Sequence, residues 1–190
     1  MKKDTTKLTV GYQYRHMLID HIIAVVVSMF IQLIAFGFML EKNVLREIAG
    51  SIFTLVYFLM MYSTAGGFAK HDNKTYTQLQ PDKKKGFFLG LMIAAITFVL
   101  FMGYKFVWAN FSADGALQNW WSIVINVLFM VWTFPYFGLM NSVSGSITWY
   151  STVTMFTVPV LASSLGYIAV CNKFDLLDKV VSFIYVKKDK

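Results

Sequence analysis

Long apolar stretches separated by short polar ones make up most of this chain. Five stretches each hold about 20 predominantly apolar residues, the length that a helix needs to cross a bilayer: about 17–40, 48–68, 86–108, 120–140 and 151–171. Beyond them, apolar residues recur at helical spacing over 174–185, which is typical of a helix lying on a membrane surface. The pattern predicts one all-α membrane domain, 1–190, a polytopic integral membrane helical bundle of about five transmembrane helices plus a C-terminal amphipathic helix.

Composition agrees with this interpretation. The chain is 57% hydrophobic and 14% charged, whereas soluble domains carry about a quarter charged residues. The net charge is +7, but the lysines lie beside the apolar stretches, so we expect them to face anionic lipid rather than nucleic acid. Cys171 is the single cysteine, which excludes an intrachain disulfide and a cysteine-based metal site. The first apolar stretch is longer than a signal-peptide core, and we interpret it as a retained span.

The basic segment 70–85 predicts the orientation of the bundle. It holds five lysines against two aspartates, and such loops stay on the cytoplasmic side. We assign the topology-setting role to Lys83, Lys84 and Lys85. The pair Gly66 and Gly67 is interpreted as the stop of the second helix. The prediction is a multi-pass protein of the cytoplasmic membrane, with the N-terminus and residues 69–85 in the cytoplasm.

Five full spans conflict with the charges at the two ends of the chain, both of which favour the cytoplasmic side. An N-terminus inside and five crossings place the tail outside, yet the tail 172–190 has five lysines against three aspartates. Pro135 is expected to kink the fourth helix, and Pro159 lies within the fifth. One resolution is that part of 135–160 is re-entrant and buried in protein. The side of the C-terminus stays open at this point.

Polar residues fall on single faces of four predicted spans. The four sets are His21, Ser28 and Gln32; Gly50, Thr54, Tyr57 and Thr64; Asn119, Ser122, Asn126 and Thr133; and Tyr150, Thr154, Thr157 and Ser164. Because lipid cannot satisfy hydroxyls or amides, each face should turn toward other helices. The faces either hold the helices together or line a polar cavity for a small solute. The candidate solute-facing residues are Gln32, Tyr57, Asn126, Thr133 and Thr157.

Two further features lie at the membrane boundary and in the third span. Gly86, Gly90 and Ala94 form a row of small residues that permits close helix packing, within the chain or against a second protein. His16 and Asp20 are i,i+4 neighbours on one face. We expect an interfacial ion pair there, with a proton-carrying or solute-binding carboxylate as the alternative. These are too few ligands for a metal site.

Known catalytic motifs are absent from the sequence, and the centres of the second, third and fifth spans contain no Asp, Glu, His, Lys or Arg. We therefore expect neither an enzyme nor a cofactor. The first hypothesis is a non-enzymatic subunit in the lipid bilayer that packs against a membrane-protein partner or a second copy. The alternative is a solute transporter, or the solute-capture component of an uptake system. In size and layout the chain looks similar to the substrate-binding components of vitamin uptake systems.

Overall fold

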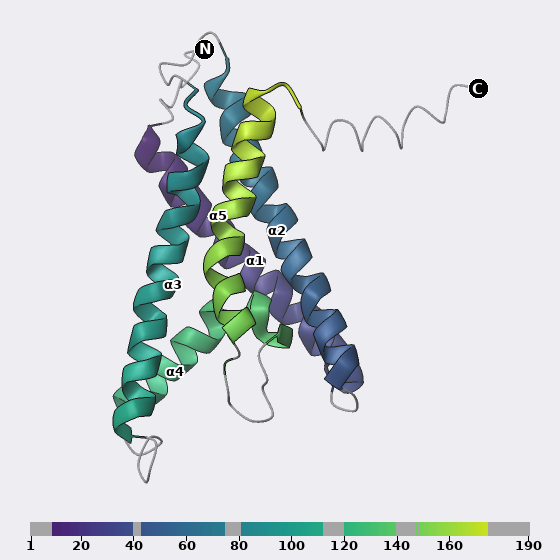
Figure 1. Cartoon of the computed structure of the whole chain (residues 1–190), viewed down its shortest axis with the longest axis vertical. Helices are drawn as coiled ribbons and strands as arrows, with labels where there is room; N and C mark the ends of the chain where they lie inside the picture. The colour runs from purple at the N-terminus through teal and green to yellow at the C-terminus, as the bar shows by residue number, and fades with distance from the viewer. Residues whose placement is uncertain are drawn as a thin grey trace, which may run out of the picture.

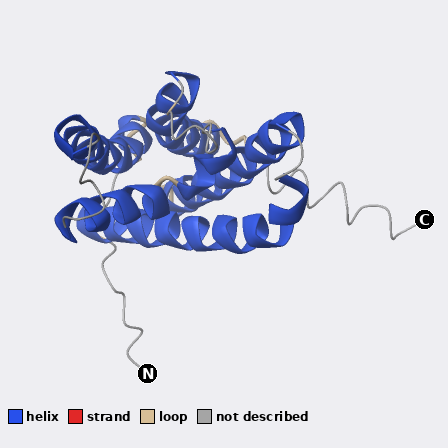
Figure 2. Ribbon diagram, turned by 90° about the horizontal axis from the view of Figure 1, so that it is seen from below, coloured by secondary structure: helices blue, strands red, loops and turns tan. Residues whose placement is uncertain are grey.

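The computed structural model describes residues 9–39, 43–74, 81–111, 120–139, 147 and 149–174. The elements are α1 (Val10–Met39), α2 (Asn43–Asp72), α3 (Lys84–Phe111), α4 (Trp120–Trp132), the 3₁₀ helix η1 (Phe134–Leu139) and α5 (Trp149–Cys171) (Figure 1). Within these ranges the chain forms helices and short loops, without a strand (Figure 2). The all-α prediction is confirmed. The predicted amphipathic helix lies beyond Phe174, outside the described residues.

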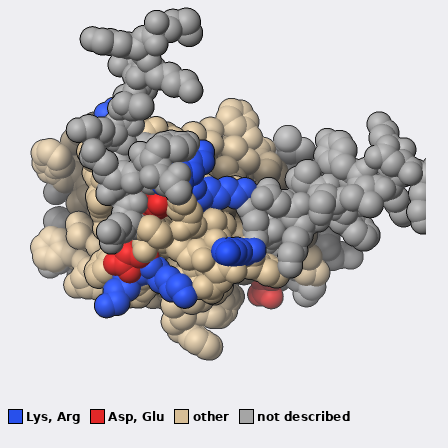
Figure 3. Space-filling view, turned by 90° about the horizontal axis from the view of Figure 1, so that it is seen from above, with Lys and Arg blue, Asp and Glu red and all other residues tan. Residues whose placement is uncertain are grey.

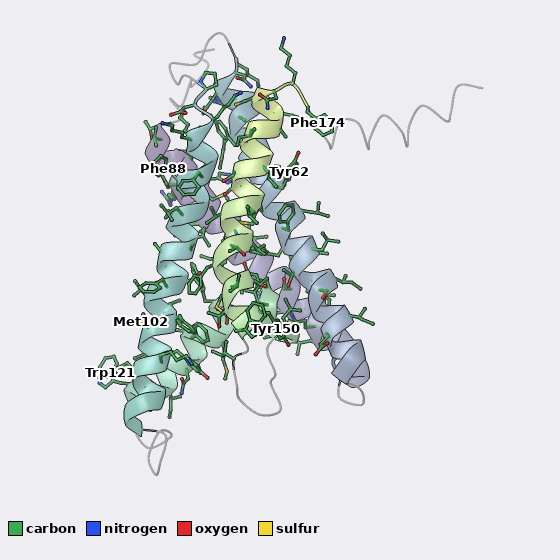
Figure 4. All side chains as sticks on the ribbon, in the orientation of Figure 1. Tyr62, Phe88, Met102, Trp121, Tyr150 and Phe174 are labelled. Carbon is green, nitrogen blue, oxygen red and sulfur yellow. The ribbon has the colours of Figure 1, made fainter. Side chains whose placement is uncertain are left out.

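Four of the helices, α1, α2, α3 and α5, are long and apolar enough to cross a membrane. Their outer faces carry large apolar side chains, for example Val99 (68% exposed), Phe106 (66%) and Trp149 (78%). Met102 and Trp121 likewise point away from the bundle (Figure 4). Apolar surface on this scale has to be covered by lipid rather than water. The chain is therefore a helical membrane bundle.

The fourth apolar segment is shorter than the sequence predicts. α4 has 13 residues, which at 1.5 Å per residue is only about 20 Å and less than a bilayer core. It leaves the lower end of α3 and rises into the bundle, where η1 follows, and α5 starts again in the lower half of the molecule (Figure 1). Pro135 explains the break, because proline lacks the amide hydrogen and disfavours helix at the residue before it.

Segment 120–139 is thus one short α-helix followed by a 3₁₀ helix, and it enters the bundle without a second long helix. The sequence prediction placed a re-entrant part within 135–160, but α5 continues through Pro159 as one helix. Four helices are long enough to cross a membrane, and α1 and α3 begin at the same end at which α2 and α5 finish (Figure 1). Lysine and arginine side chains gather on this end (Figure 3). Four crossings would place both ends of the chain on one side, which five crossings do not.

The predicted row of small residues packs inside the chain, against α5. A Cβ atom on Gly86 would lie 2.6 Å from the Ser163 carbonyl oxygen. One on Gly90 would lie 2.5 Å from the Pro159 carbonyl oxygen. Both distances are far inside normal contact, so only glycine allows the two backbones to approach this closely. Ala94, the third member of the row, is also buried.

The predicted inward-facing polar residues are buried in α1 but not in α5. In α1 the prediction is confirmed, because His21, Ser28 and Gln32 are all at most 3% exposed. In α5 it is wrong: Thr157 is exposed, and the buried face instead carries Ser151, Met155, Pro159, Ala162, Ser163, Gly166 and Tyr167. The reason is that a threonine can satisfy its hydroxyl on its own helix, as Thr157 does on the Val153 carbonyl at 2.9 Å. Close packing on the glycines of α3 then decides which face of α5 is buried.

Candidate functional site

A buried carboxylate joins all four long helices at the basic end. The Asp72 side chain, at the end of α2, is fully buried. Its Oδ1 accepts from Gln13 Nε2 of α1 at 2.8 Å. Its Oδ2 accepts from Lys85 Nζ of α3 at 2.8 Å and from the Tyr167 hydroxyl of α5 at 2.6 Å. We call these four residues the Asp72 knot.

The charge and the hydrogen-bonding capacity of Asp72 are paired within the knot. We therefore interpret the knot as a structural link between the four helices. Both carboxylate oxygens have donors and the ammonium neutralises the charge, which is the condition for burying an ion pair without large cost. The sequence pattern missed it, because Gly66 and Gly67 were interpreted as the end of the helix. That prediction is wrong: α2 continues through both glycines to Asp72. Lys85, one of the three topology-setting lysines, is thereby an internal partner as well.

The second polar group surrounds η1 in the interior of the bundle. Gln32 Nε2 of α1 donates to the Phe134 carbonyl at 2.9 Å, and the Thr54 hydroxyl of α2 donates to the Pro135 carbonyl at 3.2 Å. These carbonyl groups belong to the first two residues of η1, the 3₁₀ helix that follows the break in α4. Side chains of two neighbouring helices thus hold the irregular backbone, as membrane depth demands.

Aromatic and imidazole rings extend this group toward the basic end. His21 Nδ1 and the Tyr57 hydroxyl are 2.7 Å apart, and the His21 ring lies 4.2 Å from the Trp132 ring. Trp132 in turn donates its Nε1 hydrogen to the Thr97 hydroxyl at 2.9 Å. The Tyr57 ring packs edge-on against Tyr136 of η1 at 5.4 Å. We call the set His21, Gln32, Thr54, Tyr57, Trp132 and Tyr136 the η1 cluster; it draws on α1, α2, α4 and η1.

Three buried polar atoms of the η1 cluster have no hydrogen-bond partner among the described residues: His21 Nε2, Gln32 Oε1 and the Tyr136 hydroxyl. The Tyr136 hydroxyl interacts with the Tyr57 hydroxyl, but their arrangement falls short of a regular hydrogen bond. Each such atom costs about 1–3 kcal/mol when it is left unpaired. Unpaired buried groups are rare in native proteins and call for a bound molecule or ordered water.

The candidate solute-facing residues do not all meet in one place. Gln32 and Tyr57 lie in the η1 cluster. Thr133 is buried next to it, with its hydroxyl bonded to the Phe129 carbonyl at 2.7 Å. Asn126 lies on α4, half-buried, and its Oδ1 has no partner among the described residues. Thr157 lies on the outer face of α5, away from the other four.

His16 and Asp20 contact each other, as their spacing predicts. His16 Nδ1 is 3.1 Å from Asp20 Oδ2, and the Thr64 hydroxyl of α2 donates to the same oxygen at 2.9 Å. Both residues are partly exposed. Among the described residues, no group of three or more His, Cys, Asp or Glu side chains could hold a metal ion.

Comparison with known proteins adds no functional assignment. No protein-family model, no curated protein and no solved structure matches the chain. The class that the fold itself defines is a helical membrane bundle of four long apolar helices and one shorter apolar helix.

Proposed function

We propose that the protein carries or captures a small polar solute, which binds at the η1 cluster. The observation that supports this most is the set of three unpaired buried atoms around a broken helix. In membrane proteins, irregular backbone at bilayer depth occurs where it is enclosed by protein or lines a binding cavity, and transporters place their solute sites at such breaks.

The chemistry of the cluster favours a neutral or cationic solute. The carbonyl-bearing end of α4 points toward the interior, and a helix C-terminus carries partial negative charge. Gln32 Oε1 can only accept a hydrogen bond, whereas the Tyr136 hydroxyl can donate or accept. No lysine or arginine belongs to the η1 cluster. A small molecule with amine or hydroxyl hydrogens complements these groups, and an anion does not.

The cluster is closed in this structure, since Tyr57 is 0% and Tyr136 2% exposed. A solute therefore reaches it only when η1 moves. Two side-chain hydrogen bonds, from Gln32 and Thr54, are the polar tethers of η1 to α1 and α2. A short helix that packs between long helices in this way is suited to opening and closing one side of a site.

A different role, as a non-enzymatic subunit packed on a membrane-protein partner, was the first hypothesis from the sequence. Its main support was the row of small residues in α3, and α5 covers that row. The row of small residues therefore no longer supports the subunit role, and the η1 cluster carries the proposal.

Native mass spectrometry of the protein released gently from membranes tests the proposal. The expected result is a bound small molecule on the wild-type protein, which is lost in Gln32→Leu and kept in Thr157→Val. Thr157→Val is the matched control, because it also removes a polar group from a long helix but on the outer face. A folded wild-type protein without a bound molecule, and with ordered water on all three atoms in a high-resolution map, would contradict the proposal.

We further infer that the basic end lies in the cytoplasm of a cell bounded by its plasma membrane, following the positive-inside rule. Single cysteines introduced at Lys74 and Glu47 test this in intact cells. An impermeant thiol reagent should label the Glu47 position and spare the Lys74 position, and the reverse pattern would refute the orientation.

A further inference from the structure

A groove runs between α1 and α2 on the outside of the bundle, apart from both the knot and the η1 cluster. Its volume is about 400 Å³, and it is lined by Asp20, Val56, Leu59, Met60, Ser63 and Thr64. Leu59 is 48% exposed and Ser63 is also exposed, so the groove opens sideways, toward lipid. One wall is thus apolar, and one end carries hydroxyls and a carboxylate.

The Asp20 carboxylate in this groove is held in place through only one of its two oxygens. Thr64 and His16 both bond Asp20 Oδ2. Oδ1 has no hydrogen bond to any residue that the structure describes. A positioned carboxylate with one unused oxygen, at the edge of a lipid-facing groove, complements a cationic hydrogen-bond donor.

The depth of Asp20 matches the headgroup layer. Arg15 is exposed and marks the level of lipid headgroups on α1. Asp20 follows five residues later, which at 1.5 Å per residue is about 7.5 Å deeper. The polar layer of a bilayer is about 5–7 Å thick on each side. Asp20 therefore lies at the boundary between headgroups and acyl chains, within reach of a headgroup that bends into the groove.

We propose that this groove binds the primary ammonium headgroup of a phospholipid such as phosphatidylethanolamine. The ammonium donates to Asp20 Oδ1, the Ser63 hydroxyl lies where it can donate to a phosphate oxygen, and the acyl chains follow Val56, Leu59 and Met60. The apolar wall requires an amphiphile, and the carboxylate requires a cation. The site is separate from the proposed solute site and does not depend on it.

Other cations fit the groove less well. Its lining offers three oxygen-bearing side chains, whereas a hard cation such as Ca²⁺ takes 6–8 oxygen ligands. A quaternary ammonium such as the choline headgroup has no N–H to donate to Oδ1, and proteins bind it with aromatic faces. No aromatic residue lines this groove. The site should therefore distinguish phosphatidylethanolamine from phosphatidylcholine, although both headgroups are zwitterionic.

Competition between these two lipids tests the proposal. The purified full-length protein is exposed to equimolar phosphatidylethanolamine and phosphatidylcholine in detergent, and the retained lipid is counted by native mass spectrometry. We expect about tenfold more phosphatidylethanolamine on the wild-type protein, the ratio that one charge-assisted hydrogen bond gives. A ratio near one on the wild-type protein, or a preference for anionic phosphatidylglycerol, would overturn the proposal.

Variants separate the groove from general lipid binding. Asp20→Asn still accepts the Thr64 hydrogen bond but loses the charge, and it should bring the ratio close to one. Ser63→Trp fills the groove from an exposed position and should do the same with the fold intact. Glu47→Gln, which removes an exposed carboxylate near the other end of α2, should leave the ratio unchanged. If Asp20→Asn and Ser63→Trp both keep the wild-type ratio, or if Glu47→Gln abolishes it, the groove is not the site.

Discussion

The Asp72 knot and the η1 cluster are both buried, polar and built from several helices, but they differ in how completely their groups are paired. In the knot, one carboxylate receives three donors, from Gln13, Lys85 and Tyr167. In the η1 cluster, three buried atoms find no partner among the described residues. Both groups are expensive to bury, and only one of them has its cost offset within the protein.

This difference separates structure from function. A fully paired network stabilises one arrangement of the helices and has no free group for a ligand. An incompletely paired network is stable only with help from another molecule, and so it indicates where that molecule binds. The knot therefore fixes the basic end of the bundle, while the η1 cluster is the part of the interior where we propose that a solute binds.

The largest expected effect is on the knot itself. Lys85→Gln removes the ammonium group that donates to the buried Asp72 Oδ2 at 2.8 Å and leaves the carboxylate poorly compensated. The free energy of unfolding should fall by about 3 kcal/mol, at the lower end for a broken buried pair because Lys85 is partly exposed. Reversible SDS titration of the purified protein measures this.

The double variant Lys85→Gln with Asp72→Asn checks the cause of that loss. With the charge removed from both sides, most of the stability should return, because the uncompensated carboxylate is gone. A double variant as unstable as Lys85→Gln alone would mean that the lysine acts through packing and that the knot is not an electrostatic connection.

A smaller loss of stability is expected from disrupting the close contact between α3 and α5, the two helices that contribute Lys85 and Tyr167 to the knot. Gly90→Ala places a methyl group 2.5 Å from the Pro159 carbonyl oxygen and 2.6 Å from Val160 Cα. Both are backbone atoms that cannot turn away, so we expect a loss of about 1–3 kcal/mol. Gly67→Ala is the matched control, since nothing lies within 4 Å of its new methyl group. Equal losses for the two variants would show that helix propensity, not close packing, determines the outcome.

The most direct test of the contrast comes from two tyrosines, and the second of them should show no loss of stability. Tyr167→Phe deletes a hydroxyl bonded to Asp72 and should cost about 1.5–3 kcal/mol, as for other hydrogen bonds to charged groups. Tyr136→Phe removes a buried hydroxyl without a regular hydrogen bond, so ligand-free protein should keep its stability or gain up to about 3 kcal/mol. The same titration applied to both variants decides the point. If Tyr136→Phe costs as much as Tyr167→Phe, the η1 cluster is as fully paired as the knot.

Hydrophobic periodicity alone identifies the membrane helices and the buried face of α1. It overestimates the fourth segment, because 120–140 is predominantly apolar and only Pro135 signals that the helix breaks. It also chooses the wrong face of α5, because a count of hydroxyls does not show that Thr157 bonds its own backbone. The face follows instead from the contact of two glycines with the backbone around Ser163, which depends on a partner helix far away in sequence.

The candidate site is predictable only in part for the same reason. Gln32 and Tyr57 are recognisable as polar residues on inward faces, and both lie in the η1 cluster. Tyr136 and Trp132 are not recognisable in this way, since they look like ordinary apolar residues of a span until the break turns them inward. Asp72 was hidden because two glycines before it resemble a helix end.

The short length of α4 also bears on the order in which the helices come together in the membrane. α1, α2, α3 and α5 each satisfy their backbone within themselves, so each can enter lipid as an independent helix. The carbonyl groups of Phe134 and Pro135 in η1 also accept hydrogen bonds from two other helices, through Gln32 and Thr54. The segment that carries the proposed solute site can therefore make these contacts only after α1 and α2 have come together.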